Sequence, residues 1–218
     1  MFARFNNSAF SFCFLQTIDK KNLLTTYQQR TRSTSNLIFQ PCSNIKILLE
    51  ALGSDFFNHQ TLWVAQQLIG ARLCRRTQQG VLMDTIVETE AYLGQEDLAS
   101  HARFGKTKRN APMYAAGGIW YVYLCYGMHC MLNVVTEAEG HPSAVLIRSL
   151  KTHPGPGRLT KAFSITQNFN GLPCDPQADL WLLPAIEKLP FVATPRIGIN
   201  YSGPIWSNKP YRFVVKGF

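Results

Sequence analysis

Two glutamates, Glu88 and Glu90, lie two residues apart in an apolar run, T-I-V-E-T-E-A-Y, that ends at Tyr92. Carboxylates in such surroundings can move protons as general acids or bases. In an extended strand, alternation places on one face Ile86, Glu88, Glu90 and Tyr92. The pattern combines a carboxylate with an aromatic ring, but an isolated E-x-E is more often a solvent-facing stripe, so it needs support from the rest of the chain.

A second aromatic group follows in the run Y-V-Y-L-C-Y-G-M-H, which ends at His129. Tyr121 and Tyr123 share a strand face, and Gly127 marks a turn that carries Tyr126 at its tip. A bulky aromatic residue and a methionine at the tip of a hairpin are unusual on a soluble protein. Such a tip either packs into its own core or acts as a wedge between base pairs.

These residues must be positioned by strands separated by turns. Periodicity predicts a short helix that begins near Thr61 and stops at Gly70. It predicts strands over residues 71–76, 81–92, 119–126, 130–136 and 145–149. A further short helix is predicted over residues 158–165. The pattern indicates a single α+β domain with a largely antiparallel sheet and packed helices.

Charge favours a polyanionic partner. The 22 Lys and Arg residues exceed the 13 Asp and Glu residues, so the net charge is +9. Residues 98–136 and 140–174 contain no acid, although both contain Lys and Arg. Such segments suit contact with phosphates.

The first residues differ from the remainder. Asp19 is the sole acid before residue 48, and no sustained periodicity is seen. We expect residues 1–48 to be a basic, acid-poor and disordered N-terminal extension, and residues 49–218 to be the catalytic domain. An organelle transit peptide is the alternative for the extension.

The remaining classes receive no support. The six cysteines lack metal-ligand spacing, so no metal and no cofactor are expected. No apolar run reaches the length of about 18 residues that a membrane helix needs. We expect a monomer with no membrane partner, located in the cytoplasm of a bacterium or in the nucleus or an organelle of a eukaryote, with the bacterial cytoplasm favoured.

Several ordered blocks together resemble one family. The blocks E-T-E-A-Y, A-S-H-A, T-K-R-N, Y-V-Y-x-x-Y-G-M-H, L-N-V-V, V-L-I-R and G-P-G-R-L-T-K-A are similar, in order and spacing, to those of alkyladenine (3-methyladenine) DNA glycosylases. With R-I-G-I at Arg196 and Y-R-F at Tyr211, the resemblance covers about residues 56–217. It implies a curved sheet with a protruding hairpin that inserts into DNA. His129 departs from the family pattern, since animal members carry Tyr there.

The resemblance also implies roles for residues. Glu90 would activate water, with Arg148 holding the water and the carboxylate. The walls of a pocket for the flipped base would be Tyr92, His101, Tyr123 and Asn133, of which Asn133 would exclude ordinary guanine. DNA contacts would come from Lys106, Thr107, Arg109, Tyr126, Met128 and His129, with Tyr126 filling the gap left in the duplex.

These roles imply a base-excision repair enzyme acting on double-stranded DNA that contains damaged purines. Alkylated purines such as 3-methyladenine and 7-methylguanine carry a positive charge and leave readily, so a single general base that activates water is sufficient for hydrolysis. Hypoxanthine is a neutral substrate of the same class. No lysine falls in the pocket blocks, so no lyase step is expected. The alternatives are a non-catalytic protein that binds damaged DNA and a carbohydrate hydrolase that uses Glu88 with Glu90.

The hairpin offers a geometric test of the pocket. A two-residue turn would pair Tyr123 with Leu132 and turn Asn133 away from the pocket. A three-residue loop over residues 127–129 would pair Tyr123 with Asn133 and keep both on one face. We expect the three-residue loop, with both side chains facing Glu90.

Overall fold

The computed structural model describes residues 51–218, and the predicted N-terminal extension, residues 1–48, lies outside them. The helices are α3 (Ser54–Phe57), α4 (Thr61–Gln67), α5 (Pro156–Ala162) and α6 (Gly203–Ser207). The strands are β1 (Arg72–Thr77), β2 (Gly80–Tyr92), β3 (Trp120–Cys125), β4 (His129–Thr136), β5 (Ser143–Leu150), β6 (Leu180–Leu183), β7 (Phe191–Thr194) and β8 (Arg212–Val215).

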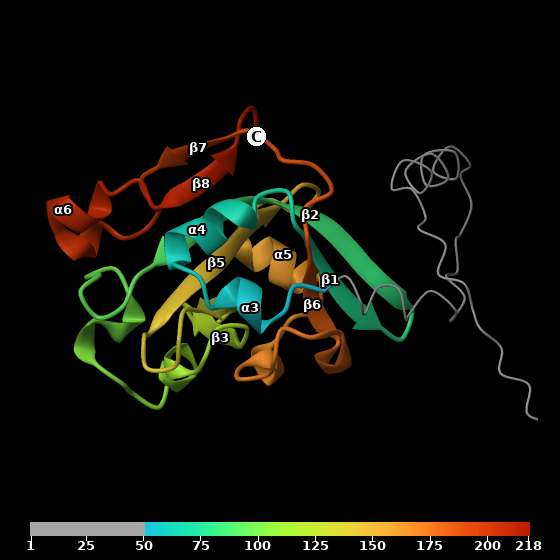
Figure 1. The fold of residues 1–218 in the computed structure, drawn as a ribbon, viewed down its shortest axis with the longest axis horizontal. Coiled ribbons are helices and arrows are strands. Elements are labelled where there is room, and N and C mark those ends of the chain that lie inside the picture. Colours follow the sequence, from blue (N-terminus) through green and yellow to red (C-terminus); the bar gives the residue numbers. More distant parts are fainter. Residues whose placement is uncertain (1–50) are drawn as a thin grey trace, which may run out of the picture. The chain divides into compact units, whose positions relative to one another are not determined.

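The strands form one eight-stranded antiparallel sheet, which confirms the predicted α+β class (Figure 1). The main path runs β3-β4-β5-β2-β1-β6, and β8 pairs with both β2 and β7. Strand β2 lies at the centre, where its carboxyl-terminal half is flanked by β5 and β8. The two glutamates of the E-x-E pattern, Glu88 and Glu90, therefore lie in the middle of the sheet.

Short 3-10 helices occupy the connections. They span His101–Phe104, Ala111–Tyr114, Gln167–Phe169, Pro176–Ala178 and Asn200–Ser202. The first is capped by Ser100, whose side chain accepts a hydrogen bond from the Ala102 N–H. This cap fixes the start of the segment that carries His101.

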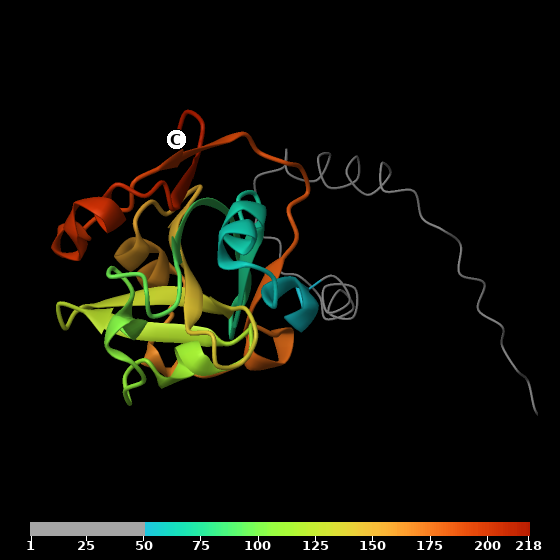
Figure 2. The ribbon, with the colours of Figure 1, turned by 60° about the vertical axis from the view of Figure 1, so that its left-hand side comes forward.

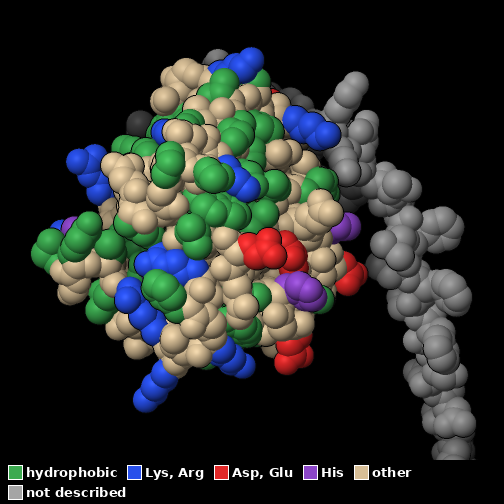
Figure 3. Space-filling view, turned by 90° about the vertical axis from the view of Figure 1, so that its left-hand side faces the viewer, with side chains coloured by type: hydrophobic (Ala, Val, Ile, Leu, Met, Phe, Trp, Pro, Cys, Tyr) green, Lys and Arg blue, Asp and Glu red, His purple; other side chains and the backbone are tan. Residues whose placement is uncertain are grey.

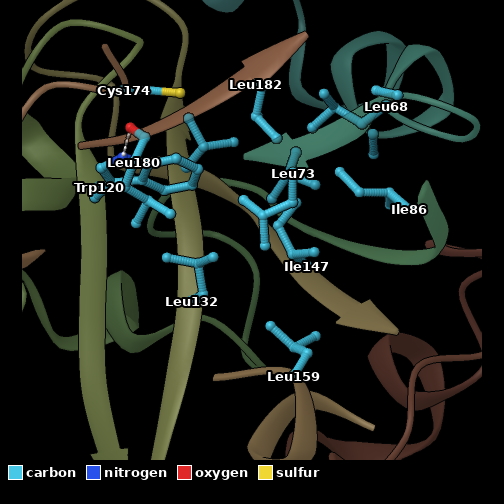
Figure 4. Packing of buried hydrophobic residues seen from close by; sticks show 14 of the residues in the cluster. Leu68, Leu73, Ile86, Trp120, Leu132, Ile147, Leu159, Cys174, Leu180 and Leu182 are labelled. Carbon is cyan, nitrogen blue, oxygen red and sulfur yellow. Dashed lines mark hydrogen bonds between the residues drawn. The ribbon is translucent and has the colours of Figure 1, made fainter. Parts of the chain in front are cut away.

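One face of the sheet packs on helices α4 and α5. Leu68, Leu73, Ile86, Leu132, Ile147 and Leu159 meet in this core (Figure 4). Trp120 is fully buried there, and its indole N–H donates to the carbonyl of Leu180. Burying a large apolar side chain stabilises the fold by about 1.5–3 kcal/mol.

The other face is left for the site, as strand alternation requires. On β5, for example, Val145 and Ile147 belong to the core, whereas Ala144 and Arg148 lie on the opposite face.

The alternation is interrupted once in β2, and this corrects the sequence prediction for Ile86. The register with β5 shifts on both sides of Glu88, as in a β-bulge. Ile86 is consequently buried in the core with Ala91 rather than placed beside Glu88. On β5, both Arg148 and Ser149 contact Glu88.

Within residues 51–218, no helix has the length and apolar character required to cross a bilayer.

Candidate active site

Glu90 is fully buried at the centre of the sheet, yet its carboxylate is surrounded by donors. The backbone N–H of Ile197 donates to Oε1 over 2.8 Å, and the hydroxyl of Tyr92 donates to Oε2 over 2.8 Å. Arg148 Nε lies 3.6 Å from Oε1. Three groups from three segments thus hold one carboxylate in a single orientation.

Burial raises the pKa of Glu90 above that of an exposed glutamate. The charge of Arg148, the Ile197 N–H and the Tyr92 hydroxyl oppose this rise, because each stabilises the ionised form. A buried carboxylate with a raised pKa is a stronger base than an exposed one once it is ionised. This combination suits a general base.

Arg148 lies closer to Glu88 than to Glu90. Its Nε is 3.0 Å from Glu88 Oε1, and Arg212 donates to the same oxygen over 2.6 Å. The hydroxyl of Ser149 donates to Glu88 Oε2. The expected contact between Arg148 and Glu90 is present, but Glu88 is the principal anchor of Arg148.

The four residues predicted as pocket walls line one pocket. Tyr92, His101, Tyr123 and Asn133 are joined there by Ala99, Met113, Tyr121, Ala144 and Tyr201. The rings of His101 and Tyr123 meet edge to face with centroids 4.5 Å apart, and Tyr121 lies 5.4 Å from Tyr123. The faces of such electron-rich rings attract a positively charged ligand.

His101 is neutral near pH 7. Burial and the charges of Arg109 and Arg103 lower its pKa to about 4. Its Nδ1 shares a hydrogen bond of 2.8 Å with the hydroxyl of Tyr121. The pocket wall formed by His101 therefore does not repel a cationic ligand.

Asn133 is buried and held rigidly. Its amide nitrogen donates to the carbonyls of Tyr121 and Met131, over 3.0 and 3.3 Å. A side chain fixed in this way cannot rotate to make room for a larger ligand.

The hairpin differs from its predicted register by one residue in each strand. Cys125 pairs with His129 and Tyr123 with Met131, so the three-residue loop covers Tyr126–Met128 rather than residues 127–129. Tyr121, not Tyr123, lies opposite Asn133. The parity is unchanged, and Tyr123 and Asn133 share one face as expected.

The physical reason for the shift is the backbone at the tip. Tyr126 and Gly127 both have positive φ, at 50° and 71°, and Met128 N–H donates to the carbonyl of Cys125. The turn thus begins one residue earlier than the glycine alone indicates. Tyr126 is 90% exposed and Met128 71% exposed.

The hairpin projects from the sheet (yellow-green in Figure 2). At the pair next to the loop, the ring of His129 lies 3.0 Å from the position that a Cβ on Gly157 would occupy. Glycine at this position lets α5 approach the hairpin. His129 is therefore exposed to solvent on one side and packed against α5 on the other.

The predicted basic stretch is exposed next to the pocket. Lys106, Thr107 and Arg109 are all exposed. Arg109 donates to the carbonyl of Leu124 and lies 5.4 Å above the ring of Tyr123. On the face viewed in Figure 3, exposed hydrophobic side chains lie among Lys and Arg, and the acidic side chains gather on the right.

The sequence analysis missed a buried ion pair beside the site. Arg196 binds Asp97 through two nitrogens and donates to the carbonyl of Ala91, and both charged side chains have no exposed surface. The guanidinium also stacks on Tyr92, 4.7 Å from the ring centroid. Ile197, the next residue, then donates to Glu90. The sequence did show Arg196 in the R-I-G-I block, but nothing in that block indicated that Asp97 would be its partner.

The model of the methylpurine-DNA glycosylase (MPG) family matches residues 55–154 and 151–218. Among similar proteins, one from Methanocella arvoryzae is 40% identical over 190 residues, which are 77% of this chain and 94% of the relative. One from Anaeromyxobacter is 42% identical over 177 residues, covering 76% and 89%. One from Sodalis glossinidius is 40% identical, covering 74% and 95%. All three carry the name "Putative 3-methyladenine DNA glycosylase".

Proposed function

Because the chain belongs to the methylpurine-DNA glycosylase family, we propose that it hydrolyses the N-glycosidic bond of alkylated or deaminated purines in duplex DNA. The substrate class comprises 3-methyladenine, 7-methylguanine and hypoxanthine. The observation that carries the proposal is the buried Glu90, held by three donors beside a pocket of aromatic rings.

A base inside a duplex is out of reach, so the damaged nucleotide must be rotated out of the stack. Tyr126, exposed at the hairpin tip, would occupy the space it leaves. The extruded base would stack in the pocket against Tyr123 and His101. Each stacking contact of a base on an aromatic ring contributes roughly 1–3 kcal/mol.

The pocket suits a positively charged purine. Tyr123 offers an electron-rich ring, and the neutral His101 adds no opposing charge. Asn133, fixed by two carbonyls, would clash with the 2-amino group of ordinary guanine. Selectivity then arises from attraction to the lesion and from exclusion of a normal base.

Hydrolysis needs one carboxylate when the leaving group is already cationic. Glu90 would take a proton from water as the sugar becomes oxocarbenium-like, and its charge would stabilise that cation. The products are the free base and an abasic site. No lysine is among the described residues that line the pocket, which supports a reaction without a Schiff base or strand cleavage.

The test is incubation of the full chain with duplex DNA methylated by an alkylating agent, followed by chromatography of the released bases. We expect 3-methyladenine and 7-methylguanine in the supernatant and no strand breaks before alkali treatment. Tight binding to methylated DNA without release would instead favour the non-catalytic damage-binding protein. Neither binding nor release would reject both.

A further inference from the structure

A basic groove lies on the same face of the sheet as Glu90, outside the aromatic pocket. Its described lining contains four cationic side chains and one carboxylate, Glu88. The cations come from β5, α5 and β8, and they are Arg148, Arg158, Lys161 and Arg212. The chemistry proposed for Glu90 leaves Arg212, Arg158 and Lys161 without a role.

Glu88 orients two of these cations. Its Oε1 contacts Nε of Arg148 at 3.0 Å and Nε of Arg212 at 2.6 Å, while Oε2 accepts from Ser149. Both arginines are thus engaged along their Nε edge. In the part of the chain that the structure describes, neither donates a hydrogen bond from its terminal guanidinium nitrogens.

An arginine has five N–H donors, and its planar end binds a phosphate through two of them. The side chains of Arg148 and Arg212 are 17% and 24% exposed, so their charges are less screened than those of surface lysines. Two such groups fixed side by side match the oxygens of one phosphate diester.

The position of the groove indicates which phosphate. Arg148 Nε is also 3.6 Å from Glu90 Oε1. In the proposed reaction, the sugar carbon under attack lies beside this carboxylate. The phosphates of a nucleotide are bonded to that same sugar. In the strand order, β8 with Arg212 lies on one side of β2, and β3 with Tyr123 lies on the other.

We propose that Arg212, together with Arg148, binds a phosphate diester that flanks the flipped nucleotide. Arg158 and Lys161 extend this contact along the DNA strand. The inference rests on the proposed function, because it takes Glu90 as the place of the reacting sugar. Glu88 is a positioning residue here, since it holds both guanidinium groups and does not touch the DNA.

The probe is a duplex with one tetrahydrofuran residue, a stable analogue of the abasic product, measured by equilibrium binding over a range of salt. We expect Arg212→Met to weaken binding by at least about tenfold. The slope of log K against log salt should fall by about one, while Arg212→Lys keeps most of that slope. The matched control is Arg76→Met, which removes an exposed arginine paired with Asp179 and should change neither quantity.

A second measurement identifies the phosphate and holds even if Arg212→Met is less stable. Each phosphate beside the tetrahydrofuran residue is replaced in turn by a neutral methylphosphonate. At one position, wild type should lose about tenfold in affinity and Arg212→Met clearly less, whereas Arg212→Lys, which keeps the positive charge, should lose nearly as much as wild type. Equal losses in wild type and Arg212→Met at both positions would overturn the proposal. This binding test is separate from base release: failure to release bases would reject the proposed function while leaving a demonstrated phosphate contact in place.

Discussion

At the scale of single residues, the proposed hydrolysis depends on the ionised carboxylate of Glu90. Glu90→Gln keeps the shape of the side chain and removes its basicity. We expect base release to fall by about 10²–10⁴-fold, the usual contribution of a general base, while lesion binding is kept. Single-turnover release and equilibrium binding on the same lesion duplex measure the two effects. Release within a few-fold of wild type would exclude Glu90 as the base.

In the proposed mechanism, the pKa of Glu90 sets the pH dependence. The ionised carboxylate is the form that accepts a proton, so we expect the rate to rise with pH as the pH passes the raised pKa of Glu90. Tyr92→Phe removes a donor that lowers this pKa. The pKa should therefore rise further, and the acid limb of the profile should move to higher pH.

The measurement uses the same 7-methylguanine duplex for wild type and variants, so that a difference between their profiles reports on the protein. Tyr121→Phe is the control, since its hydroxyl contacts His101 and not Glu90. Its acid limb should coincide with that of wild type. An unshifted limb in Tyr92→Phe would show that Tyr92 does not tune Glu90.

At the scale of elements, the β3–β4 hairpin carries the proposed wedge away from the sheet. Tyr126→Ala should weaken binding to a lesion in duplex DNA much more than to the same lesion in a single strand, because only the duplex has a gap to fill. Tyr126→Phe retains the ring and should behave as wild type on both. Comparable losses on the two DNAs would contradict the wedge role.

The strands themselves could be predicted from sequence, since alternation and turn residues are local signals. Their registers could not. The hairpin shifted by one residue at each strand because Tyr126 adopts positive φ, which no residue pattern announced. The bulge at Glu88 moved Ile86 to the core for a similar reason: it depends on the fit between β2 and β5, which are about 60 residues apart.

At the scale of the whole molecule, the buried pair Arg196–Asp97 joins the C-terminal segment to the loop after β2 across 99 residues of sequence. Removing one member of a buried pair leaves an unpaired charge and costs about 3–5 kcal/mol. We expect Asp97→Ala to lower the free energy of unfolding by that amount, measured in urea. Arg76→Ala, which breaks an exposed pair, should cost only about 0–1 kcal/mol. A small loss in Asp97→Ala would show that the segment is held by packing alone.

This pair also explains which part of the site escaped the sequence analysis. Glu90, Tyr92 and Tyr123 stand in recognisable blocks, so the aromatic pocket was predicted. The Ile197 N–H and the second arginine on Glu88 come from the last fifth of the chain. A backbone N–H donor can belong to any residue type, so the sequence does not mark it. An arginine in the sequence likewise does not indicate which carboxylate it will contact.

The two-faced sheet has a consequence for how this chain can vary. In β5, Val145 and Ile147 pack in the core, while Ala144 and Arg148 line the site. Residues close together in the sequence are therefore constrained for different reasons, some by folding and others by the chemistry of the site. Tolerance to substitution along the central strands should alternate between positions that limit the yield of folded protein and positions that limit repair. In β2 this alternation changes phase at the bulge beside Glu88. An insertion or deletion of one residue upstream of the bulge could be absorbed there, whereas one between Glu88 and Tyr92 would exchange the two faces and remove fold and site together.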